Sequence, residues 1–116
     1  MIEKKLLWAY MKEFIYAGIR RILEKECMYE ANNSQTWDRV GACVREYVSQ
    51  LVTLGYLHEI KVICDDTVNT KETVEDREFH LEFAWKVNED EEWTLASFDI
   101  MPDSGIVVSE EGEGEL

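Results

Sequence analysis

The chain has 116 residues, the length of one domain, and a formal net charge of −13. We expect no nucleic-acid partner, because such binding needs a basic face, and no membrane partner, because no apolar run approaches the roughly 18 residues of a membrane span. We also expect no signal peptide. The three cysteines lack a Cys-x-x-Cys pair, so reduced and mostly buried thiols of a protein made in a cytoplasm are expected.

The charge is unevenly distributed. Residues 1–58 hold eight Lys/Arg and seven Asp/Glu, a net of +1, whereas residues 59–116 hold four Lys/Arg and eighteen Asp/Glu, a net of −14. The acidic half either stays in solvent, where it aids solubility, or meets a basic partner.

A long amphipathic helix is predicted over residues 3–26. Its apolar residues recur at three- and four-residue spacing, namely Leu7, Met11, Phe14, Ile15, Ile19 and Ile22. Other aromatic and aliphatic residues widen this surface beyond one stripe, so we expect partners on two sides. The basic residues Lys12, Arg20 and Arg21 lie mostly toward its C-terminal half, where the helix dipole favours them.

A second helix is predicted over residues 34–54. Asn32-Asn33-Ser34 supplies the capping chemistry, Trp37 opens a regular apolar face, and Gly55 stands where a left-handed C-terminal residue is expected. Gly41 in its middle allows another backbone to come close.

After Gly55 the hydrophobic period changes to alternation, which predicts strands at 60–64, 78–87 and 92–101. One helical turn is expected near residues 73–76. In the last strand Trp93 and Leu95 have the opposite parity to Phe98 and Ile100, so either a bulge changes the register or both faces are covered.

Beyond Met101 the pattern decays into a turn, a short apolar run and a Glu/Gly-rich tail. We therefore predict an α+β fold: a domain at 1–101, with two long helices packed on a small, mainly antiparallel sheet, and an extended acidic C-terminal arm at 102–116.

Asp65 and Asp66, followed by Thr67, form the obvious candidate for a metal or catalytic site. The Glu-x-Lys of a metal-dependent nuclease is missing, and Asp or Thr after a strand more often bonds its own backbone. Cys64 ends a buried strand without a neighbouring base. His58 and His80 lack further ligands at zinc spacing. We expect no enzyme, no catalytic residue, no metal and no cofactor.

An ordered set of motifs resembles the C-terminal domain of the tail sheath proteins of contractile phages and related injection machines. In that family an Asn-Asn helix start with a Trp precedes a long helix, a Gly-x-Leu stop and a Cys-Asp-x-Thr-x-Asn loop. The matching segments here are Asn32-Asn33 with Trp37, Gly55-Tyr56-Leu57, Cys64-Asp65-Asp66-Thr67 and Asn69-Thr70. The likeness extends from about Leu6 to Ile100.

The resemblance implies a structural virion protein of a phage tail, made in the bacterial cytoplasm, that polymerises as a ring or helix around or at the cap of the tail tube. Its implied partners are copies of itself, the tube protein and neighbouring neck or baseplate proteins. The chain departs from the family by lacking the outer domains, and an acidic turn replaces the Pro-rich hairpin. A minimal sheath subunit and a neck, cap or baseplate component remain alternatives.

In the family, subunits are linked by strand exchange. We therefore expect Ile106, Val107 and Val108 to add an edge strand to a neighbouring subunit, and a fold-back onto the chain's own sheet is the alternative. Lys12, Arg20 and Arg21 are further candidates for partner binding. A small acidic adaptor that docks one partner through the first helix, without a polymer, is the other class of function considered.

Overall fold

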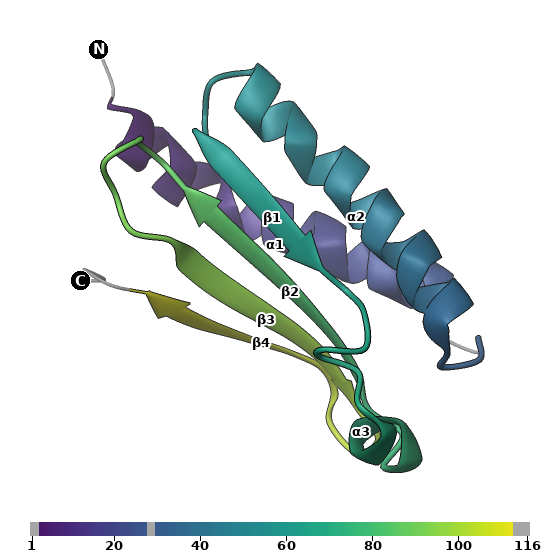
Figure 1. Ribbon diagram of the computed structural model, residues 1–116. Helices are drawn as coiled ribbons and strands as arrows, with labels where there is room; N and C mark the ends of the chain where they lie inside the picture. Colours follow the sequence, from purple (N-terminus) through teal and green to yellow (C-terminus); the bar gives the residue numbers. More distant parts are fainter. Residues whose placement is uncertain (1–2, 28–29, 113–116) are drawn as a thin grey trace.

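The computed structural model describes residues 3–27 and 30–112. Two long helices, α1 (Lys4–Glu26) and α2 (Ser34–Thr53), lie on one face of a four-stranded sheet (Figure 1). The strands are β1 (Glu59–Ile63), β2 (Phe79–Lys86), β3 (Thr94–Met101) and β4 (Gly105–Gly112), and a short helix, α3 (Lys71–Glu75), follows β1. Each strand is antiparallel to the next, in the order β1-β2-β3-β4. The predicted α+β fold is confirmed.

The helices lie where their capping residues and apolar faces place them. The Asn33 side chain accepts a hydrogen bond from the Thr36 N–H at 3.1 Å, and α2 ends just before Gly55, whose φ is +86°. Along α2, the positions Val40, Val44, Val48 and Leu51 are buried. α1 packs close to α2 because Gly18 lacks a Cβ, which would clash with the phenol ring of Tyr47.

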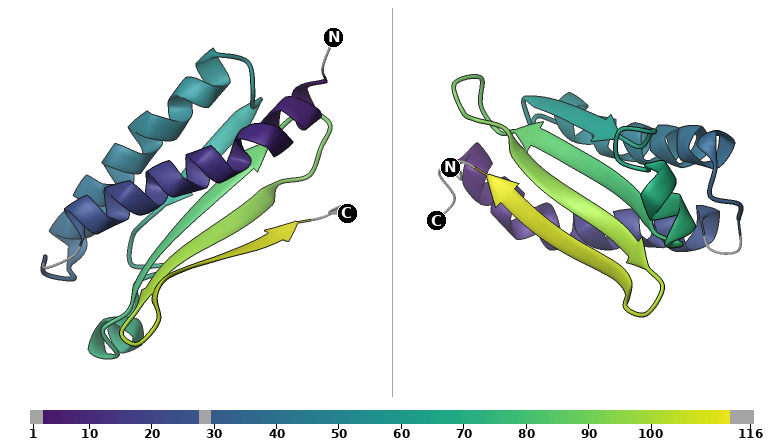
Figure 2. Two further views of the ribbon diagram at one scale, coloured as in Figure 1. Left: turned by 180° about the vertical axis from the view of Figure 1, so that it is seen from behind. Right: turned by 60° about the horizontal axis from the view of Figure 1, so that its bottom comes forward.

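The core is an aromatic and aliphatic layer between α1, α2 and the sheet. Alternate residues of β2 are buried there, namely Phe79, Leu81, Phe83 and Trp85. Trp8 of α1 meets Trp85 edge to face at 5.2 Å between ring centroids, and Tyr16 meets Phe98 of β3 at 5.3 Å. Figure 2 shows the two helices on this face (left) and the opposite face, which neither of them covers (right).

The ladder between β2 and β3 runs without a bulge from Phe79↔Ile100 to Trp85↔Thr94. The bulge considered from the sequence is therefore wrong. Phe98 faces the helices, whereas Leu95 lies on the opposite face, partly exposed. Trp93, just before β3, is also half-buried, and the Lys61 ammonium lies 4.5 Å from the centre of its ring.

The C-terminal segment differs from the extended arm expected at 102–116. Residues 105–112 fold back as β4 and pair with β3 of the same chain, which is the alternative considered above. Ile106 and Val108 pack against the core, and Glu110 is held by Tyr16. A full backbone ladder and this anchor stabilise the strand in addition to its apolar residues. Residues 113–116 lie outside the described ranges.

Among the residues that the structure describes, no helix combines the length and the apolarity that a membrane crossing requires.

Candidate assembly surfaces

The Asp65–Thr70 turn is built around its own side chains. The carboxylate of Asp65 accepts hydrogen bonds from the backbone N–H of Thr67, at 3.0 Å, and from the hydroxyl of Thr67. The backbone N–H of Asn69 donates to the backbone carbonyl of Asp65 at 2.9 Å. Asp65 and Asp66 are exposed. Within residues 3–27 and 30–112, no group of three or more His, Cys, Asp or Glu side chains is placed to hold a metal ion. The carboxylate of Asp65 therefore shapes the turn, as the sequence pattern predicted.

Asn69 closes the sheet where β1 ends. Its side chain is almost fully buried, with 1% exposed. Its amide donates to the His80 carbonyl at 2.9 Å and its oxygen accepts from the His80 N–H at 2.8 Å. The Cys64 thiol lies 3.8 Å from the same carbonyl. Cys64 and Asn69, both part of the family-like motif, thus hold the start of β2.

The Asn32-Asn33 pair joins the start of α2 to the segment before β2. While Asn33 caps the helix, the Asn32 oxygen accepts from the indole N–H of Trp37 at 2.7 Å. The Asn32 amide donates to the carbonyl of Glu78 at 2.8 Å. Trp37 is only partly buried and packs against the periphery of the core. The motif therefore fixes the angle at which the helical layer meets the sheet.

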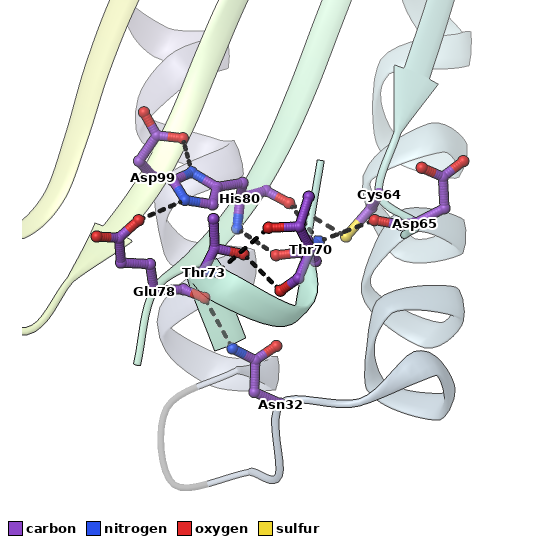
Figure 3. Close-up of polar contacts among 9 residues, drawn as sticks. Asn32, Cys64, Asp65, Thr70, Thr73, Glu78, His80 and Asp99 are labelled. Carbon is purple, nitrogen blue, oxygen red and sulfur yellow. Dashed lines mark hydrogen bonds and ion pairs between the residues drawn. The ribbon is translucent and has the colours of Figure 1, made fainter. Parts of the chain in front are cut away.

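His80 lies on the face of the sheet opposite the helices, between two carboxylates (Figure 3). Its Nδ1 is 2.6 Å from Asp99 and its Nε2 is 2.9 Å from Glu78. Burial lowers the pKa of His80, but the hydrogen bonds to Asp99 and Glu78 outweigh it and raise the pKa above 6.5. Nearby, burial and then the charges of Asp99 and Glu111 raise the pKa of Glu82. This acidic cluster was not found from the sequence, because His80 and Asp99 are brought together only by strand pairing.

The cysteines are free thiols. Burial raises the pKa of Cys27 and that of Cys64 to about 12 each. Both are therefore protonated packing residues at neutral pH, as expected for Cys64.

The residues predicted for partner binding do not form one surface. Lys12 forms an ion pair with Glu110 at 3.1 Å, and Ile106 and Val108 pack against the core. Val107 points to the opposite face of the sheet and is 40% exposed. Arg20 and Arg21 are exposed on α1.

α1 carries an exposed apolar stripe that was not predicted from the sequence. Leu6 is 48% exposed, Tyr10 69% and Phe14 76%. Phe14 had been assigned to the inner apolar face, and this assignment is wrong. The available signal was the width of the apolar surface, which predicted contacts on two sides of this helix. Adjacent large apolar residues on a helix surface are typical of an interaction site.

Comparisons of this chain with family models, with curated proteins and with solved structures gave no match. Its function is therefore inferred from its own residues and geometry.

Proposed function

We propose that this chain is a structural subunit of a contractile phage tail or a related injection machine, either a minimal tail sheath or a sheath-like neck, cap or baseplate component. The observation that carries the proposal is that the family-like residues occupy the joints of the fold. Asn33 caps α2, Gly55 ends it in a left-handed conformation, and Asn69 completes the sheet at His80. In this proposal the protein is made in the bacterial cytoplasm and works in the virion.

Assembly would use the edges of the sheet. β1 and β4 are the two outer strands, and each leaves alternate backbone N–H and C=O groups without a strand partner on its outer side. An extended segment of another subunit or of the tube protein can fill such an edge. β4 itself can also be contributed by a neighbouring copy, because the same ladder with β3 forms whichever chain supplies the strand.

A second candidate is a small acidic adaptor that docks one partner without polymerising. The exposed stripe of Leu6, Tyr10 and Phe14 on α1 favours it, because an amphipathic helix face is a common docking surface. Both candidates are binding proteins, and they differ in whether the protein assembles with itself.

The test is purification of the full chain, followed by light scattering coupled to size-exclusion chromatography and by negative-stain microscopy. The protein is examined alone and after co-expression with a phage tail tube protein. Rings, tubes or decorated tubes are expected. A monomer at all concentrations that also ignores the tube protein would contradict the proposal. A monomer that captures one other protein through α1 would favour the adaptor.

A further inference from the structure

The exposed side of α1 has two distinct halves. Its N-terminal half presents Leu6, Tyr10 and Phe14, and its C-terminal half presents Arg21 and Lys25, all of them exposed. Because these positions are four or seven residues apart, they fall on one stripe of the helix, hereafter the helix stripe. Arg20 flanks its basic end. Glu13 and Glu24 are exposed carboxylates on the same helix, and the exposed Glu3, three residues before Leu6, lies at the apolar end of the stripe.

The face of the sheet opposite the helices, hereafter the open face, has the matching division. At the start of β3 it presents the half-buried Trp93 and Leu95, with Lys61 and Lys86 over the Trp93 ring. Toward the other end it presents carboxylates around His80, namely Glu78, Glu82 and Asp99, beside the exposed Val107 of β4. Glu111 of β4 lies opposite Leu95, at the apolar end. From Leu95 to Asp99, the open face therefore passes from two large apolar side chains to the carboxylates around His80. The right view of Figure 2 shows the backbone of this face.

α1 runs in the same direction as β3. Near its N-terminus Lys5 forms an ion pair with Glu91, just before β3, and further along Tyr16 packs on Phe98. A second copy that is shifted along the sheet normal without rotation keeps this direction. Its Tyr10 then lies toward Leu95 of the first copy, and its Arg21 lies toward Asp99. The spacing also agrees, because Tyr10 to Arg21 spans about 16 Å of helix and Leu95 to Asp99 about 14 Å of strand.

We propose that the helix stripe of one copy packs on the open face of the next, so that copies stack head to tail through two different surfaces. This inference rests on the proposed function and names a contact within the assembly that is separate from the sheet edges. The occupant is a second copy because one displacement satisfies both the apolar and the charged match. Such a heterologous contact leaves both surfaces unfilled at the ends of a dimer, so it continues to add copies. Repeated without rotation it produces a straight filament, and a small rotation between copies winds it into a helix or closes it into a ring.

The charge match has local support. Burial raises the pKa of Glu82, and the charges of Asp99, Glu111 and Asp65 raise it further while His80 lowers it, so Glu82 is surrounded by more negative charge than His80 offsets. An arginine from another copy would relieve this repulsion. The net charge of −13 opposes stacking at low ionic strength. Added salt screens this long-range repulsion between copies more than it screens the short-range ion pairs within a desolvated contact.

The test uses two variants that each damage one surface. Phe14→Glu alters the helix stripe and Glu82→Arg alters the open face, and Glu75→Arg on α3 is the matched charge reversal outside both. Sedimentation velocity over a range of concentrations measures self-association, and circular dichroism verifies folding. We expect Phe14→Glu and Glu82→Arg each to weaken self-association roughly tenfold or more, and Glu75→Arg to leave it unchanged.

The decisive sample is an equimolar mixture of the two damaged variants. Each retains the surface that the other lacks, so the mixture should form a 1:1 complex that neither variant forms alone. If the mixture stays monomeric, or if Glu82→Arg assembles like the unchanged protein, head-to-tail stacking is wrong while an assembly through the sheet edges stands. If the unchanged protein does not self-associate at all, either alone or with the tube protein, the polymerising function itself fails.

Discussion

The buried side chain of Asn69 pairs with both backbone groups of His80, as the next residue of a strand would. β1 ends at Ile63, opposite Glu82, so the start of β2 has no strand on that side. The amide of Asn69 supplies one donor and one acceptor there. A polar side chain is thus used to complete a sheet that the backbone leaves unfinished.

Replacing Asn69 by Ala should destabilise the protein by roughly 2–4 kcal/mol, because two backbone groups of His80 lose their partner in a buried place. Urea unfolding followed by tryptophan fluorescence measures this change. Asn69→Asp is the informative control, because it retains the acceptor for the His80 N–H and loses the donor to the carbonyl. A loss below about 0.5 kcal/mol for Asn69→Ala would show that water replaces the side chain at little cost.

Gly18→Ala should destabilise the protein by about 1–3 kcal/mol, although alanine is the better helix former. A Cβ at this position would clash with the phenol ring of Tyr47, so α1 and α2 must separate or the ring must move. Thermal and urea unfolding measure the loss. The double variant Gly18→Ala with Tyr47→Ala removes the clash, so in this background the glycine substitution should cost less. An equal cost in both backgrounds would exclude Tyr47 as the cause.

The pH dependence of stability should carry a contribution from His80. Burial lowers the pKa of His80, whereas Asp99 and Glu78 raise it by more, so the folded-state pKa lies above the ordinary value of 6.5. The protonated form is therefore favoured by folding. Its stabilising contribution is fully present below about pH 6.5 and is lost as the pH rises through the folded-state pKa.

Urea unfolding at a series of pH values, for the unchanged protein and for His80→Gln, measures this contribution. The unchanged protein should lose stability as the pH rises above about 6.5, and His80→Gln should lose less over the same interval. The pKa of Glu82 is also raised, from an ordinary value of 4.5 that is lower than that of His80. The variant Glu82→Gln therefore separates the contribution of Glu82 from that of His80. Parallel curves for the unchanged protein and His80→Gln would show that the carboxylates do not hold the imidazolium.

The sequence was sufficient where a local signal and a buried face coincide. α2 has a side-chain cap, a regular spacing of Val40, Val44 and Val48, and a glycine at its end, so its predicted range of 34–54 agrees with Ser34–Thr53. β2 has strict alternation and was placed within one residue at each end. These elements carry their own hydrophobic period.

Elements stabilised by partners were harder to predict. β4 has little apolar surface, and its order comes from the ladder with β3 and from Tyr16, neither of which is visible in its own residues. Phe14 was misplaced because α1 is apolar on several sides, so its period does not fix which side faces the sheet. The Asp65–Asn69 segment was correctly interpreted as a structural turn, but its partner His80 lies eleven residues beyond Asn69 and no spacing rule connects them.

The last prediction concerns β4, which the structure places in its own sheet. Deleting residues 105–116 should destabilise the protein strongly, because it uncovers the edge of β3 and exposes the core beside Phe98. The burial of Ile106 and Val108 alone contributes about 1.5–3 kcal/mol for each side chain if it is complete.

If another copy can supply this strand, a synthetic peptide of residues 105–112 should bind the truncated protein and restore its thermal stability. A peptide with Ser in place of Ile106 and Val108 is the control. A truncated protein that keeps full stability would contradict the role of β4 in the sheet. A destabilised one that gains nothing from the unchanged peptide would contradict the exchange of β4 between subunits.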